Sequence, residues 1–181
     1  GYTIKTYVID TNVLIQAPYA IECFEENNLV LPLVVLEELD GLKKAEGEKG
    51  ANARAAVRKL ESYRQKGDLL QGVKLPGGGI LRIEKNFVQV ELPQDIPDDK
   101  PDNRILKVCK GLAETEKEGQ VILVTKDIVL RLKAQILGIR AEDFERERIS
   151  EDDAQYTGRT EIYFPEEKVK EFKKKGIPLT D

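Results

Sequence analysis

The 181-residue chain contains no histidine, methionine or tryptophan, and only two cysteines, Cys23 and Cys109. The lack of histidine excludes Ser-His-Asp and Cys-His nucleophilic sites, and it excludes His-ligated zinc. Both cysteines stand in apolar contexts, so we expect reduced core thiols rather than a disulfide. A metal ion held by this chain would therefore have oxygen ligands, which favours Mg²⁺ or Mn²⁺.

No apolar run approaches the roughly 18 residues that a membrane-spanning helix needs, and no signal peptide is visible. We therefore expect a soluble, cytoplasmic protein without a membrane partner. The formal net charge of −4 argues at first against binding to nucleic acid. Cations are nevertheless concentrated in two segments, one around Lys43 and Lys44 and one that includes Lys126 and Arg131. Such clusters form either phosphate-binding surfaces or ordinary solvated helix faces, and composition leaves both interpretations open.

Short apolar stretches alternate with helix-forming stretches through most of the chain, which predicts an α/β fold with a parallel sheet. We expect strands at residues 4–9, 29–31 and 121–125, and helices at 17–24, 34–44, 51–66, from Pro101 onward, and at 128–137. The stretch 121–125 is almost entirely apolar and β-branched, which is typical of a buried central strand.

Two further segments interrupt this alternation. Glycines at 77–79 break the chain, and apolar residues alternate with polar ones at 81–83 and again at 88–92. This pattern predicts an inserted β-hairpin that turns near Lys85 and Asn86. We expect the domain to cover residues 1–149. The charged remainder, 150–181, is interpreted as a tail or linker with a short strand at 160–164 and a Lys-rich helix at 165–175.

Four acidic residues stand where a parallel sheet would bring them to one edge. They are Asp10, Glu38, Asp102 and Asp127. In an open α/β sheet, ligands bind in the crevice beyond the carboxyl ends of the strands. Carboxylates gathered there would repel one another by roughly 4 kcal/mol per pair at about 4 Å and an effective dielectric near 20. A hard divalent cation removes this repulsion and supplies a catalyst, so the pattern predicts a Mg²⁺ or Mn²⁺ site.

Each acid also has an ordinary structural interpretation. Asp10 could form a turn, Asp127 could cap the following helix, and Asp102 could complement a helix dipole. Glu38 could be a solvated helix residue. These interpretations predict acids scattered over the surface, whereas the alternation of strands and helices places all four on one rim. We therefore favour the metal site, and interpret the other nearby acids, Asp40 and Asp143, as structural.

Helical periodicity separates the candidate acids from their neighbours. At about 100° per residue, Glu38 borders the apolar stripe of its helix and Glu37 points almost to the opposite side. By the same reasoning Asp102 lies on the apolar side of its helix and Asn103 does not. We therefore expect Glu38 and Asp102 to face the fold. The residues expected beside them, able to orient ligands or waters by hydrogen bonds, are Asn12 and Thr125.

Four segments together resemble the PIN domain nucleases. They are residues 8–14 (Val-Ile-Asp-Thr-Asn-Val-Leu), 31–42, 102–106 and 124–127. The glycine-rich break and the tail are similar to the amino-terminal PIN domain of proteins fused to PhoH-like ATPases. The resemblance implies a three-layer α/β/α fold with a central parallel sheet, and cleavage of single-stranded RNA with Mg²⁺ or Mn²⁺.

The resemblance also implies a role for each candidate residue. Asp10, Asp102 and Asp127 would hold one or two metal ions, with Glu38 as a further ligand or as the residue that orients the attacking water. The expected contacts to the RNA backbone come from Lys126, Arg131, Lys43 and Lys44. Two alternatives stay open: an RNA-binding module that delivers RNA to a fused ATPase and cuts little, and a toxin-like PIN domain. Substrate preference, metal number and homo-oligomerisation are left open.

Overall fold

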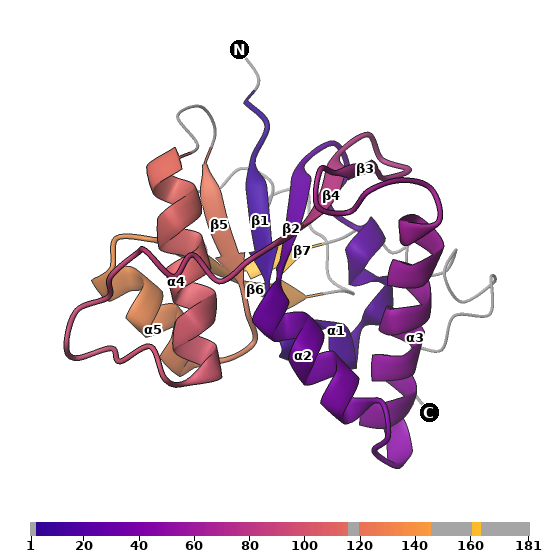
Figure 1. The fold of residues 1–181 in the computed structure, drawn as a ribbon, viewed down its shortest axis with the longest axis horizontal. Coiled ribbons are helices and arrows are strands. Elements are labelled where there is room, and N and C mark those ends of the chain that lie inside the picture. Colours follow the sequence, from indigo (N-terminus) through magenta and orange to yellow (C-terminus); the bar gives the residue numbers. More distant parts are fainter. Residues whose placement is uncertain (1–2, 116–119, 146–160, 164–181) are drawn as a thin grey trace.

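The computed structural model describes residues 3–115, 120–145 and 161–163 (Figure 1). Its elements are β1 (Thr6–Ile9), α1 (Thr11–Gln16), the 3₁₀ helix η1 (Pro18–Glu22), β2 (Asn28–Pro32), α2 (Leu33–Leu42), α3 (Gly47–Arg64), β3 (Val73–Lys74), β4 (Ile80–Glu84), α4 (Pro101–Thr115), β5 (Val121–Val124), α5 (Ile128–Ile136), β6 (Arg140–Glu145) and β7 (Glu161–Tyr163). The alternation of strands and helices confirms the predicted α/β class.

The strands form a sheet in the order β3-β4-β2-β1-β5-β6-β7. Neighbours are parallel, except that β3 runs antiparallel to β4. Strand β1 is central, with Tyr7 opposite both Leu29 of β2 and Ile122 of β5. All four residues of β1 and of β5 are buried, which explains why β5 is wholly apolar and β1 is apolar after Thr6.

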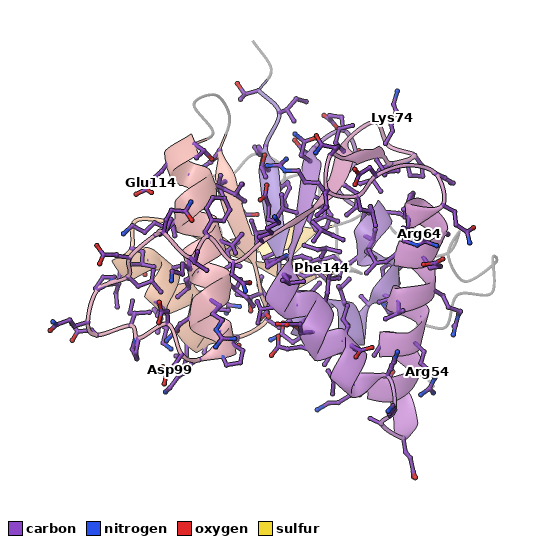
Figure 2. The ribbon with its side chains drawn as sticks, in the orientation of Figure 1. Arg54, Arg64, Lys74, Asp99, Glu114 and Phe144 are labelled. Carbon is purple, nitrogen blue, oxygen red and sulfur yellow. The ribbon has the colours of Figure 1, made fainter. Side chains whose placement is uncertain are left out.

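The helices fall into two groups around the sheet, as the predicted α/β/α layering requires (Figure 1). Helix α1 packs on α3, whereas α4 and α5 pack on β5 and β6 respectively. Helix α2 contacts both α3 and α4 and so joins the two groups. Charged side chains such as Arg64 and Glu114 project outward, while Phe144 lies in the interior (Figure 2). The edge formed by the carboxyl ends of β1 and β5 therefore lies between the two helical groups.

Several predicted boundaries are confirmed. Helix α4 begins at Pro101, whose fixed φ suits the first helical turn. Helix α5 is followed by Gly138 at φ +75°, a conformation that glycine adopts without strain. Cys23 and Cys109 are buried free thiols, as expected.

The predicted hairpin at 81–92 is wrong. Strand β4 belongs to the main sheet, where it is parallel to β2, and its antiparallel partner is β3. Strands β3 and β4 form the actual hairpin, and the glycines at 77–79 lie in the turn between them. A Cβ on Gly79 would lie 1.8 Å from the carbonyl oxygen of Asn27, so a side chain cannot fit there. Residues 88–92 form no strand, because the backbone of Phe87 has φ +50° and its ring packs over Gly111 of α4. Val90 is buried and Leu92 is half-buried, which explains these two apolar residues of the loop, whereas Val88 is 80% exposed.

The other segments differ from the prediction in part. The predicted helix 17–24 is the 3₁₀ helix η1, and α1 precedes it where a turn was expected. Strand β6 was not predicted at all. The expected strand near 160–164 is present as β7, which extends the sheet beside β6. The expected helix 165–175 lies outside the described residues. No helix within the described ranges is long and apolar enough to cross a bilayer.

Candidate metal centre

Asp10 lies at the junction of β1 and α1 with both carboxylate oxygens held. It caps α1, and its Oδ1 accepts a hydrogen bond from the Thr11 amide at 2.6 Å. Its Oδ2 accepts from the Thr125 hydroxyl at 2.7 Å. Asp10 is 4% exposed and Thr125 is fully buried. The expected hydrogen bond from Thr125 is therefore present, and it ties the ends of the two central strands together.

The electrostatic environment of Asp10 shows which acids lie near it. Burial raises its pKa from 3.8 to about 6, and hydrogen bonds from Thr125 and Thr11 oppose this rise. The negative charges of Asp102 and Glu38 raise the pKa further. Two acids from distant parts of the chain, Asp102 and Glu38, thus lie close enough to Asp10 to act on its charge.

Glu38 is half-buried on α2, whereas Glu37 is exposed, so the predicted helical register is confirmed. The Oε1 of Glu38 accepts a hydrogen bond from the Thr11 hydroxyl. Thr11 is itself 6% exposed, and its amide donates to Asp10. A single residue therefore contacts two of the four acids. Thr11 was not predicted as a site residue, because a turn was expected after the first strand where helix α1 in fact begins.

Asp102 is half-buried in the first turn of α4, but the prediction that Asn103 points away from the fold is wrong. Asn103 is 1% exposed. Its Nδ2 donates to the Pro97 carbonyl at 2.6 Å, and its Oδ1 accepts from Lys133 of α5 at 3.0 Å. The apolar stripe of α4 gave the wrong answer because the preceding loop and α5 cover a second side of the helix.

Asp127 is half-buried and caps α5, with its Oδ1 accepting from the Val129 amide at 2.9 Å. The ordinary capping interpretation is therefore correct for one of its oxygens. Its own amide donates to the Thr125 hydroxyl at 3.1 Å. Since the same hydroxyl donates to Asp10, Thr125 connects Asp127 to the other acids.

The four acids offer the oxygen ligands that a hard divalent cation prefers, but their side chains do not converge on one point. Within the described residues, no group of three acids or thiols converges closely enough to hold a metal ion. Among the ion pairs of the same residues, none involves Asp10, Glu38, Asp102 or Asp127. These are oxygen donors whose negative charge has no cationic partner in the described structure, which is the environment that Mg²⁺ and Mn²⁺ neutralise.

The candidate RNA-binding cations have partners within the fold. Lys126 donates to the Phe144 carbonyl at 2.8 Å and lies 3.3 Å from Asp143. Arg131 donates to the Thr125 carbonyl at 2.9 Å and lies 3.7 Å from the same Asp143. Asp143 therefore has the structural role expected of it.

The remaining expected residues lie around these groups. Asn12 accepts a hydrogen bond from the Lys126 amide at 3.3 Å, so it orients the loop after β5. Lys43 pairs with Asp40 at 2.8 Å, and Lys44 is exposed. RNA contacts by Lys126 and Lys43 stay predictions.

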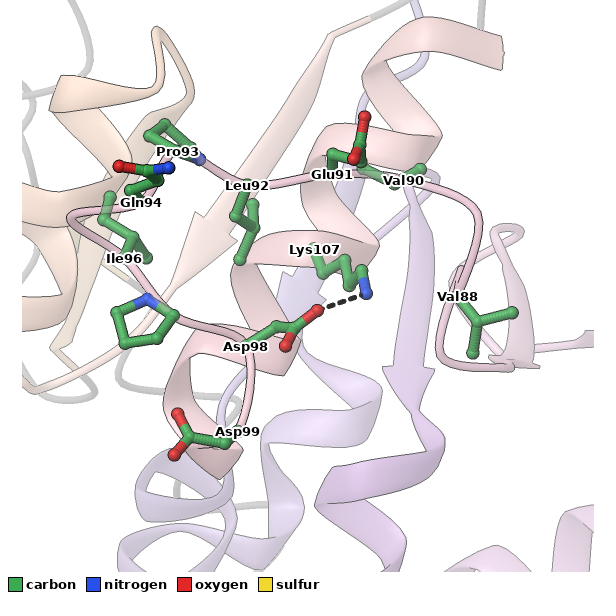
Figure 3. A pocket seen from close by; sticks show the side chains of 11 residues that line it. Val88, Val90, Glu91, Leu92, Pro93, Gln94, Ile96, Asp98, Asp99 and Lys107 are labelled. Atoms are coloured by element: carbon green, nitrogen blue, oxygen red, sulfur yellow. Dashed lines mark hydrogen bonds and ion pairs between the residues drawn. The ribbon is translucent and has the colours of Figure 1, made fainter.

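A hollow of about 510 Å³ lies beside α4 (Figure 3), and none of the four candidate acids is among the residues that line it. The loop 88–99 forms its wall, and Lys107 donates to Asp98 within it at 2.7 Å. Lys107 is 8% exposed, so this pair fastens the loop to the helix. The contact between Lys107 and Asp98 thus helps to position the loop that precedes Asp102.

Known proteins are similar to this chain over most of its length. Three proteins named Protein PhoH2 are similar to it. The one from Bacillus subtilis (strain 168) is 46% identical over 168 residues, which cover 90% of this chain and 38% of that protein. Those from Thermobispora bispora and Mycolicibacterium smegmatis are each 38% identical, over 87% and 88% of this chain and 35% and 36% of their own length. The chain thus spans little more than a third of these relatives.

A solved structure also resembles the fold. It is described as a domain of a functionally unknown protein from Methanocaldococcus jannaschii, with a TM-score of 0.48 and 21% identity over 81% of this chain and 95% of that one. The PIN domain family matches residues 7–145, which include all four acids. The chain therefore belongs to the PIN domain family, whose fold is of a nuclease type.

Proposed function

We propose that this chain is the nuclease module of a longer PIN–PhoH-like protein, and that it hydrolyses single-stranded RNA with Mg²⁺ or Mn²⁺. The observation that carries the proposal is Asp10, a buried carboxylate under the charges of Asp102 and Glu38. Perturbed carboxylates without a cationic partner are typical of metal-dependent hydrolytic sites. The greater length of the PhoH2 relatives supports a fusion to a PhoH-like ATPase.

In this proposal Asp10, Asp102 and Asp127 hold the metal, and Glu38 is a further ligand or orients the attacking water. A bound divalent cation would lower the pKa of that water and neutralise charge on the phosphate oxygens. In-line attack by water would leave a 5′ phosphate and a 3′ hydroxyl. Glu38 lies on α2 and Asp102 lies on α4, and these two helices contact each other.

Two threonines would hold these acids in position. Thr125 fixes Oδ2 of Asp10, and the Thr11 amide fixes Oδ1. The Thr11 hydroxyl fixes one oxygen of Glu38. Reactions of this kind depend on geometry to within about 0.5 Å, so side chains that remove rotamer freedom from the acids support catalysis.

The basic residues would supply salt-sensitive contacts to the RNA backbone. Lys44 is exposed, and we expect it to contact phosphate without rearrangement. Lys126 and Lys43 would exchange Asp143 and Asp40 for phosphate groups. Both present partners are carboxylates, and a phosphate oxygen can take the place of a carboxylate oxygen with little change in geometry.

The test is cleavage of an end-labelled single-stranded RNA in Mn²⁺ and in chelator, with single-stranded DNA and duplex RNA of the same sequence as comparisons. We expect cleavage of the single-stranded RNA only with metal, and its loss in Asp102→Asn. Asp99→Asn is the matched control, because Asp99 is exposed and lies three positions earlier in the same segment. Cleavage in chelator, or equal activity of both variants, would contradict the proposal.

A second candidate is an RNA-binding module with little cleavage activity. It is favoured by one observation, the lack of three convergent metal ligands among the described residues. The same experiment separates the two candidates when RNA binding is measured alongside cleavage. Retained binding without metal-dependent product would support the binding module.

A further inference from the structure

Three hydrogen-bonding groups converge on one carboxylate oxygen of Asp143 in β6. The Phe144 amide donates to this Oδ1 at 2.8 Å. The ammonium of Lys126 lies 3.3 Å from the same atom, and a guanidinium nitrogen of Arg131 lies 3.7 Å from it. Lysine, arginine and backbone N–H groups are also the groups with which proteins bind phosphate oxygens. Asp143 therefore occupies a point at which a phosphate oxygen would find the same three donors.

The two cations are held more closely by backbone carbonyls than by Asp143. Lys126 donates to the Phe144 carbonyl at 2.8 Å, and Arg131 donates to the Thr125 carbonyl at 2.9 Å. A close contact between a charged nitrogen and a carboxylate measures about 2.7–2.9 Å. The contacts of 3.3 Å and 3.7 Å to Asp143 are looser than this. Both cations would consequently keep their places if the side chain of Asp143 turned away.

The site is open to solvent and adjoins the candidate metal centre. The side chains of Lys126, Arg131 and Asp143 are 29%, 19% and 19% exposed. Ion pairs in contact with solvent contribute little to stability, so another anion can replace one partner with a small loss. Lys126 lies between Thr125 and Asp127, whose Cα atoms are each about 3.8 Å from its own. A phosphate bound there would belong to the part of the RNA beside the bond that is cut.

We propose that Lys126, Arg131 and the Phe144 amide form a phosphate site for the substrate backbone, and that Asp143 competes with RNA for it. The inference rests on the proposed function and adds an internal restraint on RNA affinity. Binding exchanges a carboxylate oxygen for a phosphate oxygen, and the side chain of Asp143 turns to solvent. The apparent affinity is then reduced by the fraction of molecules in which Asp143 leaves the site free.

The sign of one substitution separates this competition from an ordinary structural ion pair. Binding of a labelled single-stranded RNA is measured in chelator, with Asp143→Asn and Asp143→Ala beside the parent chain. We expect both variants to bind about tenfold more tightly at low salt, because the cations no longer have a charged competitor. The dependence of log Kd on log salt should steepen by about 0.7, as expected when one more phosphate of a single strand is neutralised. Weaker or equal binding by folded variants would overturn the proposal.

Glu145→Gln is the matched control for the loss of one negative charge. Glu145 is half-buried and lies two positions further along β6, on the same face of the strand as Asp143. None of the ion pairs among the described residues involves it. It should leave RNA affinity nearly unchanged, and a gain equal to that of Asp143→Asn would overturn the proposal as a general effect of charge.

A double-mutant cycle tests whether the gain depends on the freed cation. In a chain that carries Lys126→Gln, the further substitution Asp143→Asn should give little increase in affinity, because the two groups act as a pair. The full increase in that background would overturn the proposal. Melting curves of every variant should show that it is folded.

Inorganic phosphate gives a second measurement that requires no change at Asp143. At constant ionic strength, millimolar phosphate should displace part of the RNA from the parent chain and less of it from Lys126→Gln. Equal displacement from both would overturn the site, and displacement at micromolar phosphate would assign it to free phosphate rather than to RNA.

The two proposals fail in different ways, because binding is measured without metal. Tighter binding of RNA by Asp143→Asn, with no cleavage by any variant in Mn²⁺, would refute the nuclease and retain the phosphate site. Metal-dependent cleavage by the parent chain, with no gain in affinity in Asp143→Asn or Asp143→Ala, would retain the nuclease and refute the phosphate site.

Discussion

Replacing Asp10 with asparagine should stabilise the metal-free protein at neutral pH. Folding raises the pKa of Asp10 from 3.8 to about 6, chiefly through burial. This difference corresponds to about 3 kcal/mol of unfavourable free energy when the group is ionised. Asparagine removes the charge but can accept only one of the two hydrogen bonds, and the loss of the other reduces the stability by about 1 kcal/mol. The expected net gain is about 2 kcal/mol, or about 4–8 °C in melting temperature.

The pH dependence of this gain has a definite sign. Between pH 3.8 and about 6 the folded state keeps a proton on Asp10 that the unfolded state has released. The stability that Asp10 contributes is therefore full below this window and is lost as the pH rises through it. An asparagine side chain does not titrate, so the advantage of Asp10→Asn should appear across this window and stay constant above it.

Urea unfolding in chelator at several pH values from 4 to 7.5 measures the effect. Asp40→Asn is the matched control, because Asp40 is exposed and its hydrogen bond with Lys43 lowers its pKa rather than raising it. The control should show no gain above pH 6. Mn²⁺ should then stabilise the parent protein more than Asp10→Asn. If Asp10→Asn is the less stable protein at every pH, Asp10 is a structural turn residue and the metal site loses its central ligand.

Three further results are expected. Mn²⁺ or Mg²⁺ should raise the melting temperature of the parent chain, since a ligand at a hundred times Kd adds about 2.7 kcal/mol; no shift at millimolar metal would contradict the site. Glu38→Gln should reduce RNA cleavage far more than Glu37→Gln, because Glu37 is exposed; equal losses would refute the assignment. Thr11→Val should weaken Mn²⁺ binding by calorimetry about tenfold, whereas Thr11→Ser should retain it, because serine keeps the hydroxyl that contacts Glu38. Equal affinities would show that Thr11 does not position the acids.

Local patterns in the sequence predicted most of the fold. Strands β1, β2 and β5 were found as short apolar runs, α2 and α4 were found from apolar residues at the helical period, and α3 and α5 were found as helix-forming stretches closed by a glycine. Strand β6 was missed because its sequence, Arg-Ala-Glu-Asp-Phe-Glu, is mostly charged. Its strand conformation depends on pairing with β5, which is not visible locally. Strand β4 was recognised but given the wrong partner for the same reason.

The candidate site shows the same division. The orientation of Glu38 follows from the periodicity of α2 alone, and it was predicted correctly. The contact of Thr11 with Glu38 requires two helices to meet across 27 positions of sequence, and no local pattern indicates it. The burial of Asn103 depends on the preceding loop and on Lys133, so its helix by itself gave the wrong answer.

Because β1 lies between β2 and β5, the site can form only after β5 has been synthesised. The hydrogen bond from Thr125 to Asp10 joins residues 115 positions apart. At about 5–20 residues per second, a ribosome makes that much chain in roughly 6–23 s. Until then the first strand has no β5 to pair with, and parallel pairing over such distances is also slow to form. The proposed nuclease would therefore be inert until the strand that precedes Asp127 has been synthesised and has docked beside β1.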